Sequence, residues 1–346
     1  MGRRKARRRS RKGPGAGGVL LVLLLAVLAA GGIGAWMVLS PYGPSAETFV
    51  ELEPGSSSMQ IASQLEGAGV VRSQFAFDLL RWVRGRKLRA GEYRFDHPAP
   101  MIEVYARIAK GDVYTRTLIV PEGANIFDVA ARVEQAGFDS RQAFLDAATK
   151  DAGLVADFDP GAKSLEGYLF PDTYRFPRRT AASQIAAAMV RRFRAVAAQL
   201  GLKENVHTVV TMASLVERET AVDAERPLVA SVYENRLKKK MPLMADPSLI
   251  YGLELEGQWR GTIYQSDLQR NTPYNTYLHA GLPPGPVANP GARALRAALE
   301  PAQTGYLYFV ASGSNPQGRS LFSSTLDEHQ RDVADYRRAK KKAEAR

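Results

Sequence analysis

The segment Val206–Thr220 reads VHTVVTMASLVERET, and the rest of the chain can be interpreted outward from it. When each residue is advanced by 100°, its apolar side chains fall on one arc, so the pattern predicts an amphipathic helix. Glu217 falls at roughly 20° from Val206, inside the apolar arc. Glu219 falls at roughly 220°, just beyond the edge of that arc. Glu217 is therefore the carboxylate that breaks the pattern.

A glutamate on an apolar helix face has three interpretations. It pairs with a buried base, it is satisfied by hydrogen bonds, or it lies at the floor of a cleft. The pattern alone leaves all three open. Partial desolvation would raise the pKa of the Glu217 carboxyl and favour the protonated form that a general acid needs near neutral pH. Glu217 is therefore the best candidate proton donor in the sequence.

The C-terminal half around this segment is expected to be mainly helical. A long Ala/Arg-rich helix is predicted over Ala181–Leu200, a short one over Ala292–Leu299, and a final helix from Leu326. Tyr306–Val310 (YLYFV) is predicted to be a buried strand. Gly281–Gly291 (GLPPGPVANPG) holds four prolines, which exclude a helix or a central strand there.

The N-terminal half contains a weak internal repeat. Phe49–Gly69 aligns with Thr117–Gly137, and each copy has a strand-like run, a Pro/Gly turn and a helix that ends in glycine. Between the copies we expect a helix over Gln74–Gly85, a strand over Leu88–Phe95 and a helix over Ile102–Lys110. These patterns predict an α+β fold. They leave open whether the repeat is a generic scaffold or a ligand-binding duplication.

Val19–Ser40 is an uncharged, apolar run of 22 residues, long enough for a transmembrane helix. A cleaved signal peptide is the rival interpretation, but its apolar region should be about 7–15 residues long. The run ends at Pro41 without a small-residue cleavage site, which favours an uncleaved anchor. Met1–Gly18 carries eight Lys or Arg and no acid. The positive-inside rule then places this segment in the cytoplasm and everything after Pro41 outside.

The net charge of +12 is concentrated in Met1–Gly18 and in a second basic tail, Arg337–Arg346, so the body of the chain is nearly neutral. Nucleic-acid binding by the folded part is therefore disfavoured. The absence of cysteine excludes thiol nucleophiles, disulfides and Cys-ligated zinc. The four histidines are far apart in sequence, and no HExxH, Gly-x-Ser-x-Gly or phosphate-binding loop occurs. We expect neither a metal nor a cofactor.

Five separated motifs resemble the endolytic murein transglycosylase (MltG, YceG-like) family over roughly Phe49 to Tyr336. They are Ser164–Phe176 (SLEGYLFPDTYRF), Met212–Ala221 (MASLVERETA), Glu225–Arg236 (ERPLVASVYENR), Asp246–Gly252 (DPSLIYG) and Thr272–Gly285 (TPYNTYLHAGLPPG). The resemblance implies a membrane helix, a LysM-like region that covers the repeat, and a catalytic region that carries the glutamate helix.

The resemblance also implies a reaction. The first Glu of the SLVERET motif would be the acid/base, which maps onto Glu217. Such an enzyme cleaves the β-1,4 bond between N-acetylmuramic acid and N-acetylglucosamine in peptidoglycan without water. One carboxyl protonates the glycosidic oxygen and then deprotonates the muramyl C6 hydroxyl, which closes a 1,6-anhydro ring. A hydrolase instead needs two carboxyl groups flanking the bond.

Supporting roles in binding the sugar strand are expected from further polar and aromatic residues in the same motifs. Each also has a plain structural interpretation as a turn former or a turn-fixing side chain. These residues are Glu166, Asp246, Tyr274, Asn275 and Tyr277.

The predicted organisation has six parts. They are a basic cytoplasmic segment (1–18), a transmembrane helix (19–40), a LysM-like α+β subdomain (41–115), a second α+β or connecting subdomain (116–178), a catalytic domain (179–336) and a basic tail (337–346). The expected partners are nascent glycan strands, the membrane and, by family analogy, peptidoglycan synthases. The alternative is a non-catalytic, membrane-tethered scaffold that binds peptidoglycan.

Overall fold

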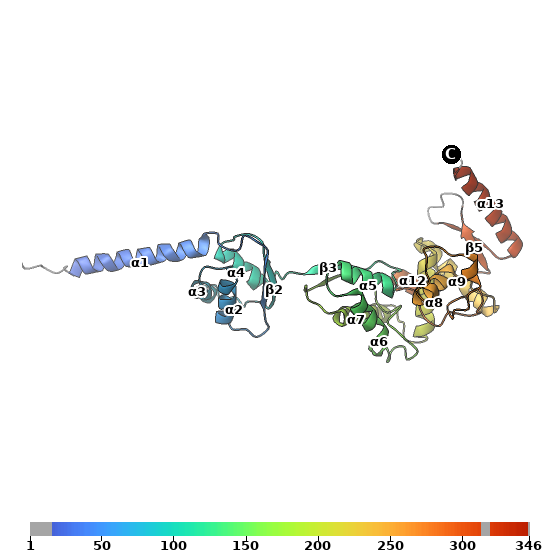
Figure 1. Cartoon of the computed structure of the whole chain (residues 1–346), viewed down its shortest axis with the longest axis horizontal. Coiled ribbons are helices and arrows are strands. Elements are labelled where there is room, and N and C mark those ends of the chain that lie inside the picture. Colours follow the sequence, from blue (N-terminus) through green and yellow to red (C-terminus); the bar gives the residue numbers. More distant parts are fainter. Residues whose placement is uncertain (1–15, 313–318, 345–346) are drawn as a thin grey trace, which may run out of the picture. The chain divides into compact units, whose positions relative to one another are not determined.

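The computed structural model describes residues 16–312 and 319–344. The chain divides into two compact units, Met1–Thr115 (unit 1) and Arg116–Arg346 (unit 2). Helices and two-stranded antiparallel sheets make up both units, which confirms the predicted α+β class (Figure 1). Most of the basic N-terminal segment (residues 1–15) and the last two residues of the basic tail lie outside the described residues.

Unit 1 begins with the long apolar helix α1 (Ala16–Leu39). Its span Gly18–Leu39 has a mean hydropathy of 2.5 and is largely exposed, and near its end Val38 packs against the core of unit 1. By length and composition this helix could cross a membrane, so the predicted apolar helix is confirmed and fits a single-pass anchor.

The folded part of unit 1 is a small sheet covered by three helices. Strands β1 (Thr48–Leu52) and β2 (Gly91–Phe95) pair antiparallel, and helices α2 (Ser58–Gly67), α3 (Gln74–Arg84) and α4 (Met101–Lys110) complete the unit. Serine N-caps begin α2 and α3, and glycines in the left-handed conformation end α3 and α4. The predicted helices and strands of this region are confirmed. The LysM-like likeness stays a prediction.

Unit 2 opens with the second copy of the repeat, β3 (Arg116–Ile119) followed by α5 (Ile126–Gln135). Asn125 caps α5 by accepting the N–H groups of the first turn, which explains where this helix begins. Helix α6 (Arg141–Lys150), strand β4 (Thr173–Phe176) and the long α7 (Ala182–Gln199) follow, and β4 pairs antiparallel with β3.

Helix α8 (Val206–Glu219) lies at the centre of unit 2 and is covered on more than one side. It packs against α12 (Ala292–Leu299), α9 (Arg226–Lys238) and α10 (Asp246–Leu255). A short helix, α11 (Gln265–Leu268), follows α10. The hydrophobic core on one side of α8 includes α5, α6 and α7, and a second cluster fills the side toward α9 and α10. Residues 116–178 and 179–336 thus lie in one compact unit.

The chain ends with a hairpin, β5 (Tyr308–Ala311) and β6 (Ser320–Ser323), and helix α13 (Leu326–Glu344). The expectation of a buried strand over Tyr306–Val310 is wrong in two respects: β5 begins two residues later, and all four of its residues are only partly buried. The physical reason is that β5 pairs with β6 alone among the described strands, so its other edge is not covered by a further strand. The proline-rich segment Gly281–Gly291 contains neither helix nor strand, as predicted.

Candidate active site

The last turn of α8 carries two carboxylates that meet different surroundings. Residues two apart on a helix project about 200° from each other, so Glu217 and Glu219 point to opposite sides. Because α8 is covered on both sides, the Glu217 side chain is buried and Glu219 is partly buried. The helical wheel placed Glu219 outside the apolar arc, and it failed to predict this burial because it assumed one covered face.

Glu217 is held in a buried ion pair. Arg226, the first residue of α9, donates from Nη1 to Glu217 Oε1 at 2.7 Å, and the Gly291 N–H donates to Oε2 at 2.9 Å. The two charged side chains are only 4% and 5% exposed. Burial raises the pKa of Glu217, as the sequence predicts, but the Gly291 N–H and the Arg226 guanidinium oppose that rise. Of the three interpretations, pairing with a buried base and satisfaction by a hydrogen bond are both observed.

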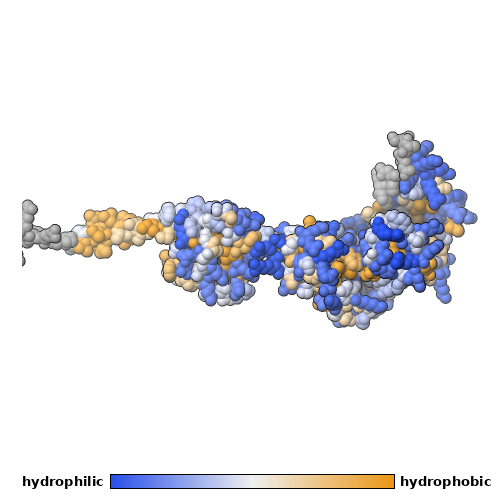
Figure 2. Space-filling view, viewed as in Figure 1, coloured by the Kyte–Doolittle hydropathy of each residue, from blue (hydrophilic) through white to orange (hydrophobic). Residues whose placement is uncertain are grey.

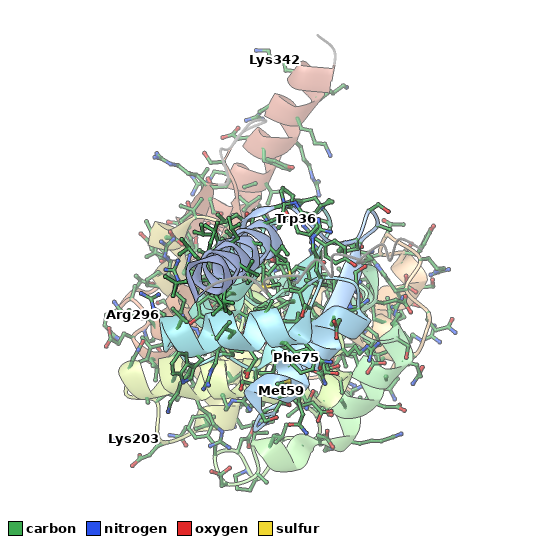
Figure 3. The ribbon with its side chains drawn as sticks, turned by 90° about the vertical axis from the view of Figure 1, so that its left-hand side faces the viewer. Trp36, Met59, Phe75, Lys203, Arg296 and Lys342 are labelled. Carbon is green, nitrogen blue, oxygen red and sulfur yellow. The ribbon has the colours of Figure 1, made fainter. Side chains whose placement is uncertain are left out.

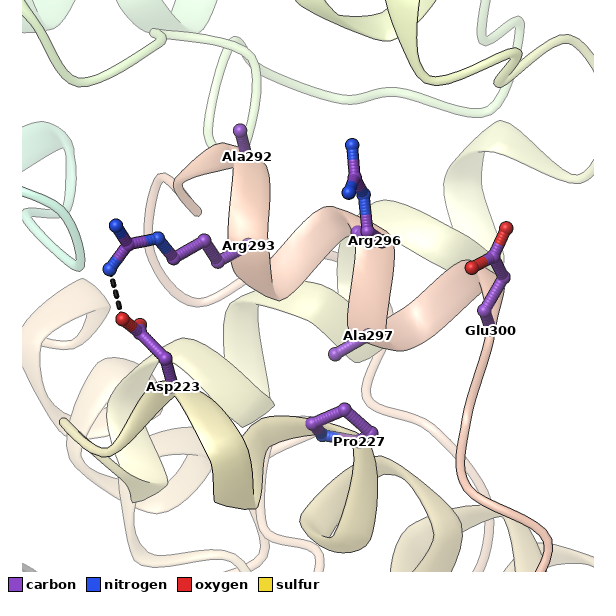
Figure 4. Close-up of a pocket in the computed structure, with 7 residues that line it drawn as sticks. All are labelled: Asp223, Pro227, Ala292, Arg293, Arg296, Ala297 and Glu300. Carbon is purple, nitrogen blue, oxygen red and sulfur yellow. Dashed lines mark hydrogen bonds and ion pairs between the residues drawn. The ribbon is translucent and has the colours of Figure 1, made fainter.

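Arg226 also approaches two further carboxylates, Asp223 at 3.3 Å and Glu122 at 3.9 Å. Asp223 in turn accepts from Arg293 across a groove of about 360 Å³ (Figure 4). The groove lies between the start of α9 and helix α12, and Glu217 is not part of its wall. On this side of α8, ion pairs therefore connect the start of α9 with the residues before α5 and with α12.

Glu219 has a different environment. The Tyr233 hydroxyl, from α9, donates to Glu219 Oε1 at 2.6 Å. The pKa of Glu219 is raised to about 7. Burial is the main cause and the nearby Asp246 carboxylate adds to it, while the Tyr233 hydrogen bond acts in the opposite direction. Among the described residues no side-chain cation contacts this carboxyl within 4 Å. Glu219 therefore has the features that were expected of Glu217: burial beside a cleft and a pKa near neutrality.

A cleft of about 420 Å³ lies beside Glu219. Its walls come from α8, α9, the start of α10, the loop after Asn275, the hairpin and α13. The lining residues are Glu219, Tyr233, Arg236, Leu243, Met244, Asp246, Tyr277, Tyr308, Phe309, Leu326 and His329. Carboxyl, phenol and aromatic groups around an open apolar space are suited to a sugar chain.

Two of the predicted binding residues line this cleft. Asp246 is the first residue of α10, and Tyr277 donates a hydrogen bond from its hydroxyl to Asp246 Oδ1. Burial, and then the bond to Asp246, raise the pKa of Tyr277, so its hydroxyl keeps its proton at neutral pH. The structure thus brings Asp246 and Tyr277 together with Glu219, and it does not bring them together with Glu217.

Glu166 lies elsewhere, 2% exposed inside unit 2. Its Oε2 accepts the Ile126 N–H at 2.9 Å, and its Oε1 accepts from the Asn289 side chain at 3.0 Å. Burial raises the pKa of Glu166 to about 8. These contacts fasten the start of α5 to the proline-rich segment, which favours the turn-fixing interpretation of this residue.

The remaining two predicted residues are engaged within the protein. Asn275 is fully buried, donates to the Leu268 and Arg270 carbonyls at 3.1 and 2.8 Å, and accepts the Tyr277 N–H. Tyr274 packs edge-on against Tyr251, with ring centroids 5.1 Å apart. Neither lines the cleft. Asn275 nevertheless shapes it, because it holds the turn that presents Tyr277.

Sequence reasoning missed Glu219, Tyr233 and the late residues Tyr308 and His329. The ERET motif contains both glutamates, so the signal for Glu219 was present. The helical periodicity was interpreted with one buried face only, which made Glu217 the preferred proton donor. The other three residues reach the cleft through contacts made far along the chain. Within residues 16–312 and 319–344 no group of three or more His, Asp or Glu side chains is arranged to hold a metal ion.

Comparisons with known proteins agree on one family. The model of the YceG-like family matches residues 50–335. An endolytic murein transglycosylase of Bacillus subtilis (strain 168) is 34% identical, covering 86% of this chain and 88% of that protein. One of Streptococcus pneumoniae (strain D39) is 28% identical over 92% of this chain, which spans 64% of that longer protein.

A solved structure gives the same result. The 2.6 Å crystal structure of a yceG-like protein from Listeria monocytogenes aligns with a TM-score of 0.54 and 29% identity, covering 83% of this chain and 99% of that one. The family match spans most of the chain and includes both units and the cleft. The chain therefore belongs to the YceG-like family.

Proposed function

We propose that this protein is an endolytic transglycosylase of peptidoglycan, a lyase that cuts glycan strands internally between N-acetylmuramic acid and N-acetylglucosamine. The names of its relatives support the reaction class, and they make the non-catalytic scaffold the less favoured alternative. Support from the molecule itself comes from a cleft with a carboxyl whose pKa is near neutrality.

Glu219 is our candidate for the acid/base, and its position in the wall of the cleft is the observation that carries the assignment. A general acid must hold a proton at working pH, and a carboxyl of pKa about 7 does so for about half of the molecules at neutrality. Glu217 instead contacts a guanidinium at 2.7 Å, which favours its ionised form, and both of its oxygens already have donors. The acid/base role that the resemblance gave to Glu217 stays a prediction.

In the proposed reaction the Glu219 carboxyl donates its proton to the glycosidic oxygen as the bond from that oxygen to the muramyl C1 breaks. The muramyl C6 oxygen then bonds to C1, and the Glu219 carboxylate accepts the proton released by that hydroxyl. The carboxyl is thereby regenerated and no water is consumed. Asp246 lines the same cleft as Glu219, so its carboxylate is our candidate for stabilising positive charge that develops on the sugar ring.

Tyr233 is a positioning residue in this scheme, because its hydroxyl donates to one oxygen of Glu219 and so fixes the carboxyl. Tyr277 orients Asp246 in the same way. Arg236 donates to the carbonyls of Leu307 and Leu243 at 2.7 and 2.8 Å, which fastens the strand that carries Tyr308 to the cleft.

The proposed location follows from α1. With α1 as an uncleaved anchor and the basic residues before it in the cytoplasm, the folded part of unit 1 and all of unit 2 lie on the extracytoplasmic side, where strands are made. An anchor restricts the enzyme to strands near the bilayer. This suits cleavage of nascent glycan and places synthases among the expected partners.

The test compares two matched substitutions on one helix, Glu219→Gln and Glu217→Gln. Purified full-length protein is incubated with sacculi, and the released muropeptides are identified by mass spectrometry. We expect wild type to yield 1,6-anhydro ends. Glu219→Gln should lose about a hundredfold or more of that activity with its circular dichroism unchanged, because general acid catalysis is removed. Glu217→Gln should retain activity at temperatures at which it stays folded.

The outcomes separate the site from the function. Loss of activity in folded Glu217→Gln, with retention in Glu219→Gln, would overturn the assignment to Glu219 and support the original prediction. If wild type released only reducing muramic acid ends, or nothing, the proposed reaction itself would be wrong.

A further inference from the structure

The outward face of α3 is a stripe of large apolar side chains. Phe75, Leu79, Trp82 and Val83 are 70%, 61%, 74% and 67% exposed. Their spacing of four, seven and eight residues places them on one side of the helix, while Phe77 on the other side is completely buried in the core of unit 1. A soluble domain rarely leaves such a contiguous patch in water, so a ligand or surface is expected to cover it.

This stripe lies where α1 joins the unit. Arg72, two residues before α3, stacks on Trp36 at 4.3 Å and on Tyr42 at 4.5 Å, and donates from Nη2 to the Pro41 carbonyl at 3.2 Å. Helix α1 also contacts α3 and α4 directly. In Figure 1, α3 lies at the edge of unit 1 from which α1 extends, and Figure 3 views that side, with Trp36 and Phe75 both facing the reader.

Trp36 indicates which part of α1 lies at the membrane surface, because tryptophans near the ends of membrane helices are enriched at the level of the lipid headgroups. It is the fourth residue from the C-terminal end of α1. The stacking of Arg72 on Trp36 therefore places the beginning of α3 at that level. Figure 2 shows hydrophobic colour on α1 and again at the adjacent edge of unit 1.

The charges near the stripe fit an anionic surface. The exposed residues Arg84, Arg86, Lys87 and Arg89 follow directly, and the one acid of α3, Asp78, is only partly exposed. An apolar helix face bordered by basic residues is the pattern of helices that lie in a membrane interface. A second protein copy would have no need of this basic border or of the link to Trp36.

We propose that the face of α3 formed by Phe75, Leu79, Trp82 and Val83 lies in the headgroup region of an anionic lipid bilayer. Unit 1 is then held against the membrane at two places, α1 and α3, and does not swing freely on its anchor. The proposal rests on α1 crossing that bilayer and is independent of which carboxylate is catalytic.

The test uses the full-length chain in nanodiscs that contain phosphatidylglycerol. Because the chain has no cysteine, single substitutions place one nitroxide label at a time. Leu79→Cys probes the stripe, Leu28→Cys probes the middle of α1, and Glu51→Cys, at the one exposed position of β1, is the water-facing control. Collision rates with oxygen, which concentrates in lipid, and with a nickel chelate, which stays in water, report the depth of each label.

We expect the label at position 79 to collide with the nickel chelate about tenfold less often than the label at 51, and with oxygen more often, because the stripe lies among lipids. Nickel accessibility at 79 equal to that at 51, with position 28 protected, would overturn the proposal while leaving the membrane span intact. Protection of position 79 from both reagents would overturn it in favour of a protein covering this face.

A second variant tests the stripe as a unit. Phe75→Ser/Trp82→Ser removes apolar surface that unit 1 does not use for its core, so circular dichroism should stay unchanged. The nickel accessibility at position 79 should then rise to within about twofold of the value at 51, since the apolar attraction is lost. Unchanged protection in this folded variant would contradict the proposal.

Discussion

The Glu217–Arg226 pair should behave as a structural ion pair, and its two single substitutions should differ in cost. Glu217→Gln leaves Arg226 compensated by Asp223 at 3.3 Å and Glu122 at 3.9 Å, so only a charge-assisted hydrogen bond is lost, about 1.5–3 kcal/mol of unfolding free energy. Arg226→Met leaves a buried carboxylate with only the Gly291 N–H, which should cost about 3–5 kcal/mol at neutral pH.

The cost of Arg226→Met should also depend on pH, because loss of the cation raises the pKa of Glu217 further. The folded protein then keeps a proton that the unfolded chain releases above its ordinary carboxyl pKa. Stability is therefore retained below that pKa and lost as pH rises through the raised value. We expect the difference between wild type and Arg226→Met to be smaller at pH 5 than at pH 8.

The assay is urea unfolding in detergent micelles, with Trp259 as the reporter of unit 2 after replacement of Trp36 and Trp82 by Phe in every variant. The double variant Glu217→Gln/Arg226→Met completes the cycle. Its cost should be at least about 1 kcal/mol below the sum of the single costs, because the two groups are in contact. Additive costs, or a pH-independent cost for Arg226→Met, would show that the pair does not have the proposed structural role.

Three further outcomes follow from the same contacts. The initial rate on sacculi should fall as pH rises above about 7, when Glu219 loses its proton. Asp246→Asn should move this fall to lower pH, because Asp246 raises the pKa of Glu219, and Tyr233→Phe should move it to higher pH, because the Tyr233 hydrogen bond lowers that pKa. A pH profile that neither variant moves would argue against Glu219. Gly167→Ala should destabilise unit 2 by about 2 kcal/mol or more in thermal unfolding. Gly167 has a φ of +86°, and a Cβ added there would lie 2.5 Å from the side chain of Pro286. A melting temperature within 1 °C of wild type would contradict this. Glu166→Gln should cost about 1–3 kcal/mol near pH 5, because an amide offers only one acceptor where two oxygens now accept donors. Its cost should shrink as pH rises from the ordinary carboxyl pKa to about 8, because over that range folded wild type keeps a proton that the unfolded chain releases; a cost that grows with pH would refute this.

Elements set by local signals were accessible from the sequence. Glycine ends, Pro/Gly turns and regular apolar spacing predicted the helices of unit 1 and both β-turn-α units, and α8 was predicted to within one residue. The strand over Tyr306–Val310 was predicted less well, because its burial depends on how many strands join the sheet, which no local pattern reports.

The candidate site shows the same limit. Periodicity correctly marked Glu217 as a carboxylate removed from water, but burial by an ion pair and burial beside a cleft give the same pattern in a single helix. The difference depends on Arg226, Tyr233 and Asp246, which arrive from other helices. Asp246 and Tyr277 came from the family resemblance, and their contact closes a separation of 31 residues that spacing alone does not relate.

The hairpin and final helix have a consequence for biosynthesis. Tyr308 and His329 form one wall of the cleft, yet His329 is translated 110 residues after Glu219. A polypeptide still emerging from the ribosome therefore carries the acidic group without its opposite wall. Glycan cleavage that needs the complete cleft must wait until synthesis and export have passed this point. This order would protect peptidoglycan from cleavage by incomplete chains.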